Sequence, residues 1–151
     1  KYILDGGKSQ IGVESTIINL TSKPSILRLG GLDISKIEKV LKIKVLINTN
    51  SKKEIAPGQF PLHYSPGIPL RTNVKIPKKN EAFLLIKKRK IKLKNYFYLS
   101  EKKNLKHAAK NLYSLLRRVK KNGYKMIAVE KIPNIGIGKT INDRLNRASR
   151  Y

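Results

Sequence analysis

A proline-marked segment near the middle of the chain carries the side chains best suited to chemistry. Residues 56–66 have the sequence Ala-Pro-Gly-Gln-Phe-Pro-Leu-His-Tyr-Ser-Pro, which places His63 and Tyr64 between two prolines. Flexible linkers are rich in glycine and serine, and stiff linkers in repeated proline. A linker with its own imidazole and phenol groups is typical of a segment that also forms part of a site. We therefore predict a lid in which Tyr64 covers a ligand and excludes water, or reaches a phosphate.

Each of these two side chains also has a structural interpretation. Tyr64 would then only pack the linker against the fold. His63 would anchor the linker conformation instead of carrying a proton. We keep His63 as a possible part of the lid.

Two more candidates lie earlier in the chain, on predicted strands. Arg28 ends a strand just before Gly30-Gly31, where a guanidinium group can reach a phosphate and the glycines let a ligand approach the backbone. The alternative is a surface arginine that pairs with Asp33 or Glu38.

Ser15 lies with Thr16 inside an otherwise apolar strand, where a buried hydroxyl needs a hydrogen-bond partner. That partner could be a substrate or simply a neighbouring backbone group. We interpret the adjacent Glu14 as a structural or solvent-facing charge.

Two other motifs imitate catalytic signatures. Residues 136–140, Gly-Ile-Gly-Lys-Thr, follow a predicted strand as a P-loop would, but the P-loop spacing requires glycine where Pro133 stands. Residues 142–144, Asn-Asp-Arg, could hold a catalytic acid. Acidic residues favour the first turn of a helix, so we assign this motif to folding and domain packing.

The composition is that of a globular protein. The 151 residues are 40% hydrophobic and include no cysteine, which excludes thiolate metal sites and disulfides. No apolar run approaches the ~20 residues that a membrane span needs. We expect a cytoplasmic protein.

The net charge of +25 invites an RNA-binding hypothesis. Lysine outnumbers arginine more than threefold, and isoleucine and asparagine are also abundant, a pattern that A/T-rich codons explain. An RNA-binding surface would be expected to use more arginine. The alternative function is a basic module that binds RNA through residues 87–94 and the aromatic residues 96–98, or a regulatory module without catalysis.

The hydrophobic pattern predicts an α/β fold in two parts. Strands are expected over 13–20, 25–29 and 45–48, with a helix after the N-cap residue Asp33. A linker over 49–68 separates a first part, 1–48, from a second part, 69–151.

The second part is expected to alternate strands and helices, which favours parallel pairing. Its predicted strands cover 81–86, 96–99 and 125–130, and its predicted helices 104–121 and 141–149. Gly123 follows the longer helix as a C′ residue. The basic run 87–94 is expected to form a solvated hairpin edge.

Several of these motifs, taken in order, resemble one family. They are Leu4-Asp5-Gly6-Gly7, the segment 12–18, the segment 26–30, the linker ending His63-Tyr64-Ser65-Pro66, and the segment 138–145. The order and spacing are similar to those of long-form threonylcarbamoyl-AMP synthases. Two departures are Leu29, where proline is usual, and Pro61-Leu62 before His63.

The resemblance implies the C-terminal strands and helix of a YrdC-like catalytic domain, a structured linker, and a small Rossmann-like domain. It implies a nucleotidyltransferase that converts L-threonine, bicarbonate and ATP into threonylcarbamoyl-AMP and pyrophosphate. Ser15 would bind threonine, and Arg28 and Tyr64 would bind ATP, with Mg²⁺ held mainly by the phosphates. No catalytic residue or protein metal ligand is assigned.

The same resemblance makes predictions about partners and completeness. The product would pass to a separate tRNA threonylcarbamoyl transferase complex, so that direct tRNA binding is not required. The chain starts without methionine, already as a strand, and has no signal peptide. We expect it to be the C-terminal part of a longer enzyme and to be inactive alone.

Overall fold

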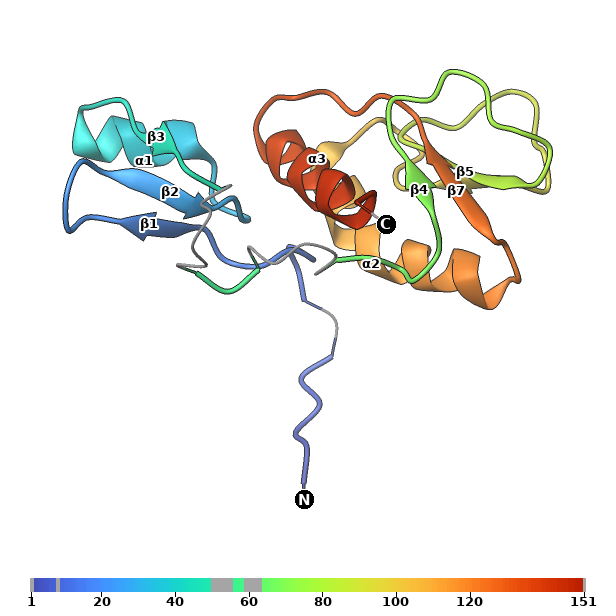
Figure 1. The fold of residues 1–151 in the computed structure, drawn as a ribbon, viewed down its shortest axis with the longest axis horizontal. Coiled ribbons are helices and arrows are strands. Elements are labelled where there is room, and N and C mark those ends of the chain that lie inside the picture. The colour runs from blue at the N-terminus through green and yellow to red at the C-terminus, as the bar shows by residue number, and fades with distance from the viewer. Residues whose placement is uncertain (1, 8, 50–55, 59–63, 151) are drawn as a thin grey trace.

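The computed structural model describes residues 2–7, 9–49, 56–58 and 64–150. Within them the fold is mixed α/β, as predicted, with two sheets that lie side by side (Figure 1). The elements in chain order are β1 (Ile17–Asn19), β2 (Ser25–Arg28), α1 (Ile34–Leu41), β3 (Leu46–Ile47), β4 (Leu70–Arg71), β5 (Glu81–Leu85), β6 (Tyr96–Tyr98), α2 (Leu105–Lys121), β7 (Met126–Val129) and α3 (Ile137–Ala148).

The first sheet has the strand order β1-β2-β3. β1 pairs with β2 antiparallel, and β2 pairs with β3 in parallel through α1. The predicted N-cap is confirmed, because the Asp33 carboxylate accepts a hydrogen bond from the Ser35 N–H. α1 packs its apolar side against the sheet around the buried residues Ile26, Leu29, Ile34 and Val45.

The second sheet is fully parallel, with the order β4-β7-β5-β6. Both α2 and α3 cover one side of it, and their apolar residues form the main core with alternate residues of β5, β6 and β7. A smaller cluster on the other side contains Val74, Phe83, Leu85 and Ala128. Parallel pairing in this part was predicted correctly.

Helix α2 is bounded by the residues that the sequence indicated. Asn104 accepts hydrogen bonds from the N–H groups of Lys106 and His107, which satisfies two donors of the first turn. At the other end Gly123 has a φ of 83°, the left-handed conformation that glycine adopts without strain.

Some predicted elements were wrong in type or extent. The basic run 87–94 is not part of a hairpin, because the strands that it joins, β5 and β6, are parallel. α3 begins at Ile137 instead of 141, since residues 138–140 are helical. Of the predicted strand 13–20, only 17–19 is paired, and β4 was not predicted.

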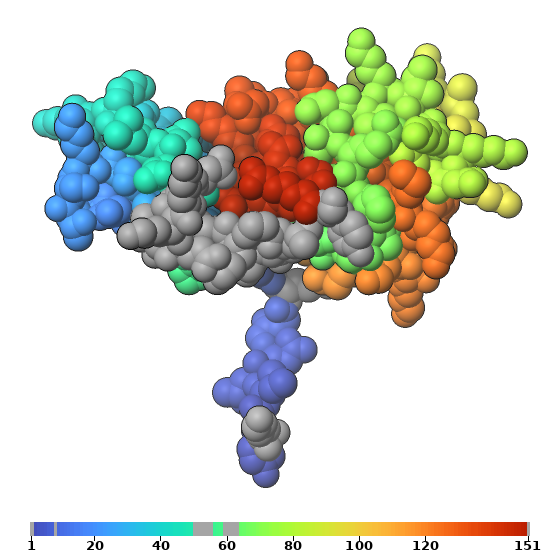
Figure 2. Space-filling view, viewed as in Figure 1, coloured from blue at the N-terminus to red at the C-terminus, as the bar shows by residue number. Residues whose placement is uncertain are grey.

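Residues 2–7 project away from the body of the molecule (Figure 2). Tyr2, Ile3 and Leu4 are fully exposed. Among the described residues, no helix has the length and apolar character that crossing a membrane would require.

Candidate functional site

Arg28, at the end of β2, is fixed by three hydrogen bonds from its guanidinium group. Nη2 donates to the Ser15 hydroxyl at 3.0 Å, and Nε donates to the Ser15 carbonyl oxygen at 3.1 Å. Nη1 donates to the Pro57 carbonyl oxygen at 3.2 Å. Three of the five N–H donors of the guanidinium are thereby used within the described residues, which leave two for a ligand.

The surface ion pairs that were the alternative for Arg28 do not form. The Asp33 carboxylate caps α1. The Glu38 carboxylate accepts from Lys44 and from the Val45 N–H. Arg28 therefore joins the segment before β1 to the linker, and its guanidinium lies beside Ser15.

Tyr64 is buried at the junction of the linker and the second sheet's helices. Its ring stacks on the Tyr113 ring, with centroids 5.7 Å apart and planes at 16°. The guanidinium carbon of Arg144 lies 4.4 Å from the Tyr64 centroid, a cation–π contact. Burial raises the pKa of the Tyr64 hydroxyl, so the phenol is neutral at physiological pH.

Gly58 brings Tyr64 and Arg28 together. A Cβ atom built on Gly58 would lie 2.5 Å from the Tyr64 hydroxyl oxygen and 3.2 Å from Arg28 Cδ. Gly58 also has a φ of 88°. Only glycine fits here without displacing its neighbours, because this backbone conformation is strained for other residues and the space for a side chain is already filled.

Glu14 is a structural charge, as the sequence indicated. Its carboxylate accepts from Arg144 Nε at 3.1 Å and from the Tyr113 hydroxyl at 3.2 Å. Burial acts to raise the pKa of Glu14, but hydrogen bonding to the backbone and the Arg144 charge outweigh it, so that the pKa lies below its usual value. The carboxylate therefore stays ionised beside Arg144 and the Tyr113 hydroxyl.

Side chains of α3 hold the first sheet in place. Arg144, with only 1% of its side chain exposed, donates to the Leu29 carbonyl oxygen at 2.6 Å and forms an ion pair with Asp143. The Thr140 hydroxyl donates to the Gly30 carbonyl oxygen at 2.8 Å. These contacts agree with a packing role for 142–144. Gly138, Lys139 and Thr140 themselves lie inside α3 instead of in a phosphate loop.

The predicted site residues therefore meet in part. Ser15 and Arg28 are hydrogen-bonded, and Tyr64 reaches the same point through Gly58. His63 lies outside the described residues. A hollow of about 370 Å³ beside Tyr64 is lined by Glu14, Tyr113 and residues of the linker and α2, and neither Ser15 nor Arg28 lines it.

Tyr113 and Arg144, which contact Tyr64 at this junction, were not predicted from the sequence to contact the linker. One signal for Arg144 was available. It lies three residues after the buried Ile141 and four before the buried Ala148, so it falls on the apolar side of α3. An arginine at such a position must find partners inside the protein.

The aromatic residues that the alternative RNA-binding function would use are not arranged as that function requires. Phe97 is buried and meets the Tyr124 ring edge-on, and Arg118 lies over it. Tyr96 is half-buried and contacts the Phe83 ring edge-on. Bases stack on exposed rings, so these aromatic residues offer no such platform. The run 87–94 is largely exposed.

No group of three or more histidine, cysteine or carboxylate side chains that could hold a metal occurs in the part of the chain that the structure describes.

Comparison with known proteins identifies the family. Residues 32–150 match the family model for the threonylcarbamoyl-AMP synthase C-terminal domain. The threonylcarbamoyl-AMP synthase of Pyrococcus abyssi is 31% identical over 99% of this chain and 49% of its own length. That of Bacillus subtilis is 28% identical over 97% of this chain and 48% of its own length. The chain belongs to the threonylcarbamoyl-AMP synthase family.

Solved structures agree with this assignment. Pyrococcus abyssi Sua5 in complex with L-threonine matches with a TM-score of 0.79 and 28% identity over 97% of this chain and 48% of that one. A variant of the same protein, with a histidine and the tyrosine after it both replaced by alanine, matches with a TM-score of 0.73 and 28% identity over the same shares. The chain spans about half the length of these relatives.

Proposed function

We propose that this chain is the part of an L-threonylcarbamoyladenylate synthase that contributes a substrate-binding edge and its lid. The observation that carries the proposal is the contact of Arg28 with Ser15, with the Tyr64 hydroxyl beside Arg28 at Gly58. The three side chains to which we assign phosphate binding, threonine binding and covering of the site thus lie close together. The solved relative that holds L-threonine supports threonine as the amino-acid substrate.

The reaction would proceed in two steps. The amino nitrogen of L-threonine attacks the carbon of bicarbonate, and water leaves, giving a carboxylated threonine. An oxygen of the new carboxylate on the threonine nitrogen then attacks the α-phosphorus of ATP, and the bond from that phosphorus to pyrophosphate breaks. Two of the residues would have separate roles in this scheme. Arg28 would stabilise negative charge on the phosphates, and Ser15 would orient threonine.

Tyr64 would exclude water from the carboxylated intermediate, which loses CO₂ easily in solution. Its ring is already held by Tyr113 and Arg144, so the lid position requires little further ordering. This chain has one adjacent His-Tyr pair, His63-Tyr64. In a solved variant of a relative, a histidine and the tyrosine after it are both replaced by alanine, which supports the inclusion of His63-Tyr64 in the proposed lid.

Mg²⁺ would enter with ATP, held mainly by the phosphates, and would neutralise the leaving pyrophosphate. The product would pass to a separate transferase complex that modifies tRNA, in the cytoplasm, without a requirement that this protein bind tRNA.

The test is pyrophosphate release from ATP. The protein is expressed with whatever coding sequence precedes Lys1 in the same reading frame, and the 151-residue chain is expressed separately. We expect the former to release pyrophosphate only when threonine and bicarbonate are both present. We expect no release from the 151-residue chain, since it spans about half of its relatives. Release that does not depend on threonine would overturn the proposal.

A further inference from the structure

The second sheet has a point at which neighbouring strands send their connections to opposite sides. After β7 the chain continues into α3, which packs with α2 on one side of the sheet. After β5 the connection to β6 runs over the other side, where Arg89, Lys90 and Ile91 line a hollow with Phe83 and Tyr96. β5 and β7 are adjacent and parallel. In open α/β sheets, ligands bind in the crevice at the carboxyl ends of such strands.

A hollow of about 450 Å³ lies at that crevice, and we call it the carboxyl-edge hollow. Its volume falls in the range of small-molecule sites. It is lined by Ile86, Lys87 and Arg89 after β5, by Lys103 before α2, and by Glu130, Lys131 and Pro133 after β7. The topology and the cavity therefore indicate the same place independently.

The only carboxylate in this lining already has partners on both oxygens. Glu130 Oε2 pairs with Arg89 Nη2 at 2.7 Å, and Glu130 Oε1 accepts from the Ile86 N–H. Three ammonium groups remain, those of Lys87, Lys103 and Lys131. None of them has an ion pair or a side-chain hydrogen bond within the described ranges. The hollow therefore presents cations that are available to an anionic ligand.

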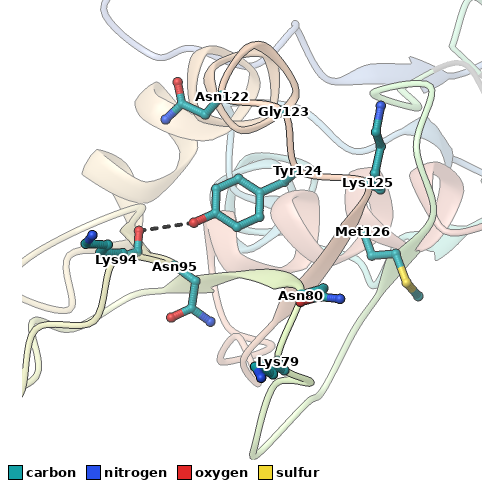
Figure 3. A pocket seen from close by; sticks show the side chains of 9 residues that line it. All are labelled: Lys79, Asn80, Lys94, Asn95, Asn122, Gly123, Tyr124, Lys125 and Met126. Carbon is teal, nitrogen blue, oxygen red and sulfur yellow. Dashed lines mark hydrogen bonds between the residues drawn. The ribbon is translucent and has the colours of Figure 1, made fainter.

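A second hollow, of about 690 Å³, provides a contrast at the opposite edge of the same sheet, and we call it the amino-edge hollow (Figure 3). It contains three lysines as well, Lys79, Lys94 and Lys125. However, it is lined by Asn122 and Gly123 at the C-terminal end of α2, the negative end of the helix dipole. The carboxyl-edge hollow lies at the positive ends, because Lys103 comes just before α2 and Pro133 before α3. The two hollows thus have the same net side-chain charge, but only the carboxyl-edge hollow lies at the N-terminal ends of helices.

We propose that the carboxyl-edge hollow binds a small organic phosphate ester, with the phosphate on Lys87, Lys103 and Lys131 and the organic part on Pro133. The site is separate from Ser15, Arg28 and Tyr64, none of which lines it. It does not depend on the synthase reaction, and it gives the second sheet a ligand of its own.

The test is a titration of the ¹⁵N-labelled 151-residue chain with AMP, followed by amide chemical shifts at about 0.15 M salt, where exposed charges are largely screened beyond ~8 Å. We expect saturable shifts at Ile86, Glu130 and Lys131. Shifts confined to residues around Ser15 and Arg28 would overturn the proposal while supporting a nucleotide at the synthase site. The absence of any saturable shift would overturn it as well.

Matched variants separate a site from general positive charge. Lys87→Gln with Lys131→Gln removes two charges at the carboxyl edge, and Lys79→Gln with Lys125→Gln removes two at the amino edge. All four side chains are exposed, so both variants should retain the wild-type fold. We expect AMP to bind about tenfold more weakly to the first variant and less than about twofold more weakly to the second. Equal weakening in both would overturn the proposal.

Inorganic phosphate and ribose 5-phosphate test the organic part of the ligand. We expect AMP to bind more tightly than either, because its base can bury apolar area on the half-buried Pro133 and on the aliphatic parts of the lysine side chains. Equal affinities of AMP and inorganic phosphate would contradict the assignment of an ester.

Discussion

The guanidinium group of Arg144 lies over the Tyr64 ring, with its central carbon 4.4 Å from the ring centroid. The same guanidinium binds the Glu14 carboxylate and the Leu29 carbonyl oxygen. One buried side chain from the last helix therefore contacts the linker and two parts of the first sheet's chain. Because Glu14 directly precedes Ser15, the position of the proposed threonine ligand depends on this arginine.

Replacement of Arg144 by methionine should lower the free energy of unfolding by about 3 kcal/mol, because it leaves the Glu14 carboxylate without its cation and leaves Asp143 paired with Arg147 alone. Urea denaturation measures this. Arg117→Met on α2 is the matched control, since Arg117 is exposed and should change stability by less than about 0.5 kcal/mol. Equal losses in the two variants would contradict a special role for Arg144.

Thr140→Val should cost about 1–3 kcal/mol of stability, because the buried Gly30 carbonyl oxygen loses its donor. Thr140→Ser retains the hydroxyl and serves as the control. Amide exchange at residues 29–31 should accelerate in the valine variant and much less in the serine variant. Identical exchange in both would show that the hydroxyl does not hold this segment.

Gly58→Ala should displace Tyr64, because the new Cβ atom would lie 2.5 Å from its hydroxyl oxygen. Gly123→Ala is a close control, since Gly123 has a φ of 83° but nothing within 4 Å of a Cβ atom. Both variants carry the strain of a positive φ, about 1 kcal/mol. Only Gly58→Ala should change the near-ultraviolet circular dichroism of the tyrosines. Equal spectra would mean that the Tyr64 contact is absent in solution.

Acid should destabilise the second sheet through Glu81. The side chain of Arg71 donates to both Glu81 carboxylate oxygens at 2.7 Å, and this pairing lowers the pKa of Glu81. A carboxyl whose folded pKa lies below its unfolded pKa stabilises the protein above the unfolded value, near 4.5, and loses that contribution as the pH falls through the folded value.

The stability of the wild type should therefore exceed that of Glu81→Gln at pH 7, and the difference should shrink toward about pH 3. Urea denaturation at both pH values measures it. Glu101→Gln is the control, because Glu101 forms an exposed pair with Lys88 that contributes little at either pH. A difference that stays constant with pH would show that Glu81 does not titrate in this range.

The elements predicted from local signals were mostly right. Asp33 caps its helix as predicted, because capping depends on residues two or three positions away, and such a signal is visible in the sequence. The hairpin at 87–94 was wrong because β5 and β6 pair in parallel, so that the run between them is a crossover. The direction of pairing depends on the whole sheet and not on the residues of the connection. The start of α3 was missed because glycines at 136 and 138 suggested a loop.

The candidate site shows the same limit. Ser15, Arg28 and Tyr64 stand in recognisable motifs, so they could be named from the sequence. Tyr113 and Arg144 reach Glu14 across 99 and 130 positions of the chain, respectively. No local pattern specifies contacts at such separations, and only the folded arrangement of the two sheets brings these residues together.

The central claim is that Arg28 binds ATP in a synthase, and the rate of pyrophosphate release tests it most directly. The protein is expressed from its whole reading frame as Arg28→Gln and, for comparison, as Arg150→Gln, since Arg150 is exposed. Both are assayed with threonine, bicarbonate and ATP. We predict that kcat/KM falls about 10²-fold for Arg28→Gln and stays within about twofold of wild type for Arg150→Gln. Unchanged kinetics for a folded Arg28→Gln protein would contradict the account.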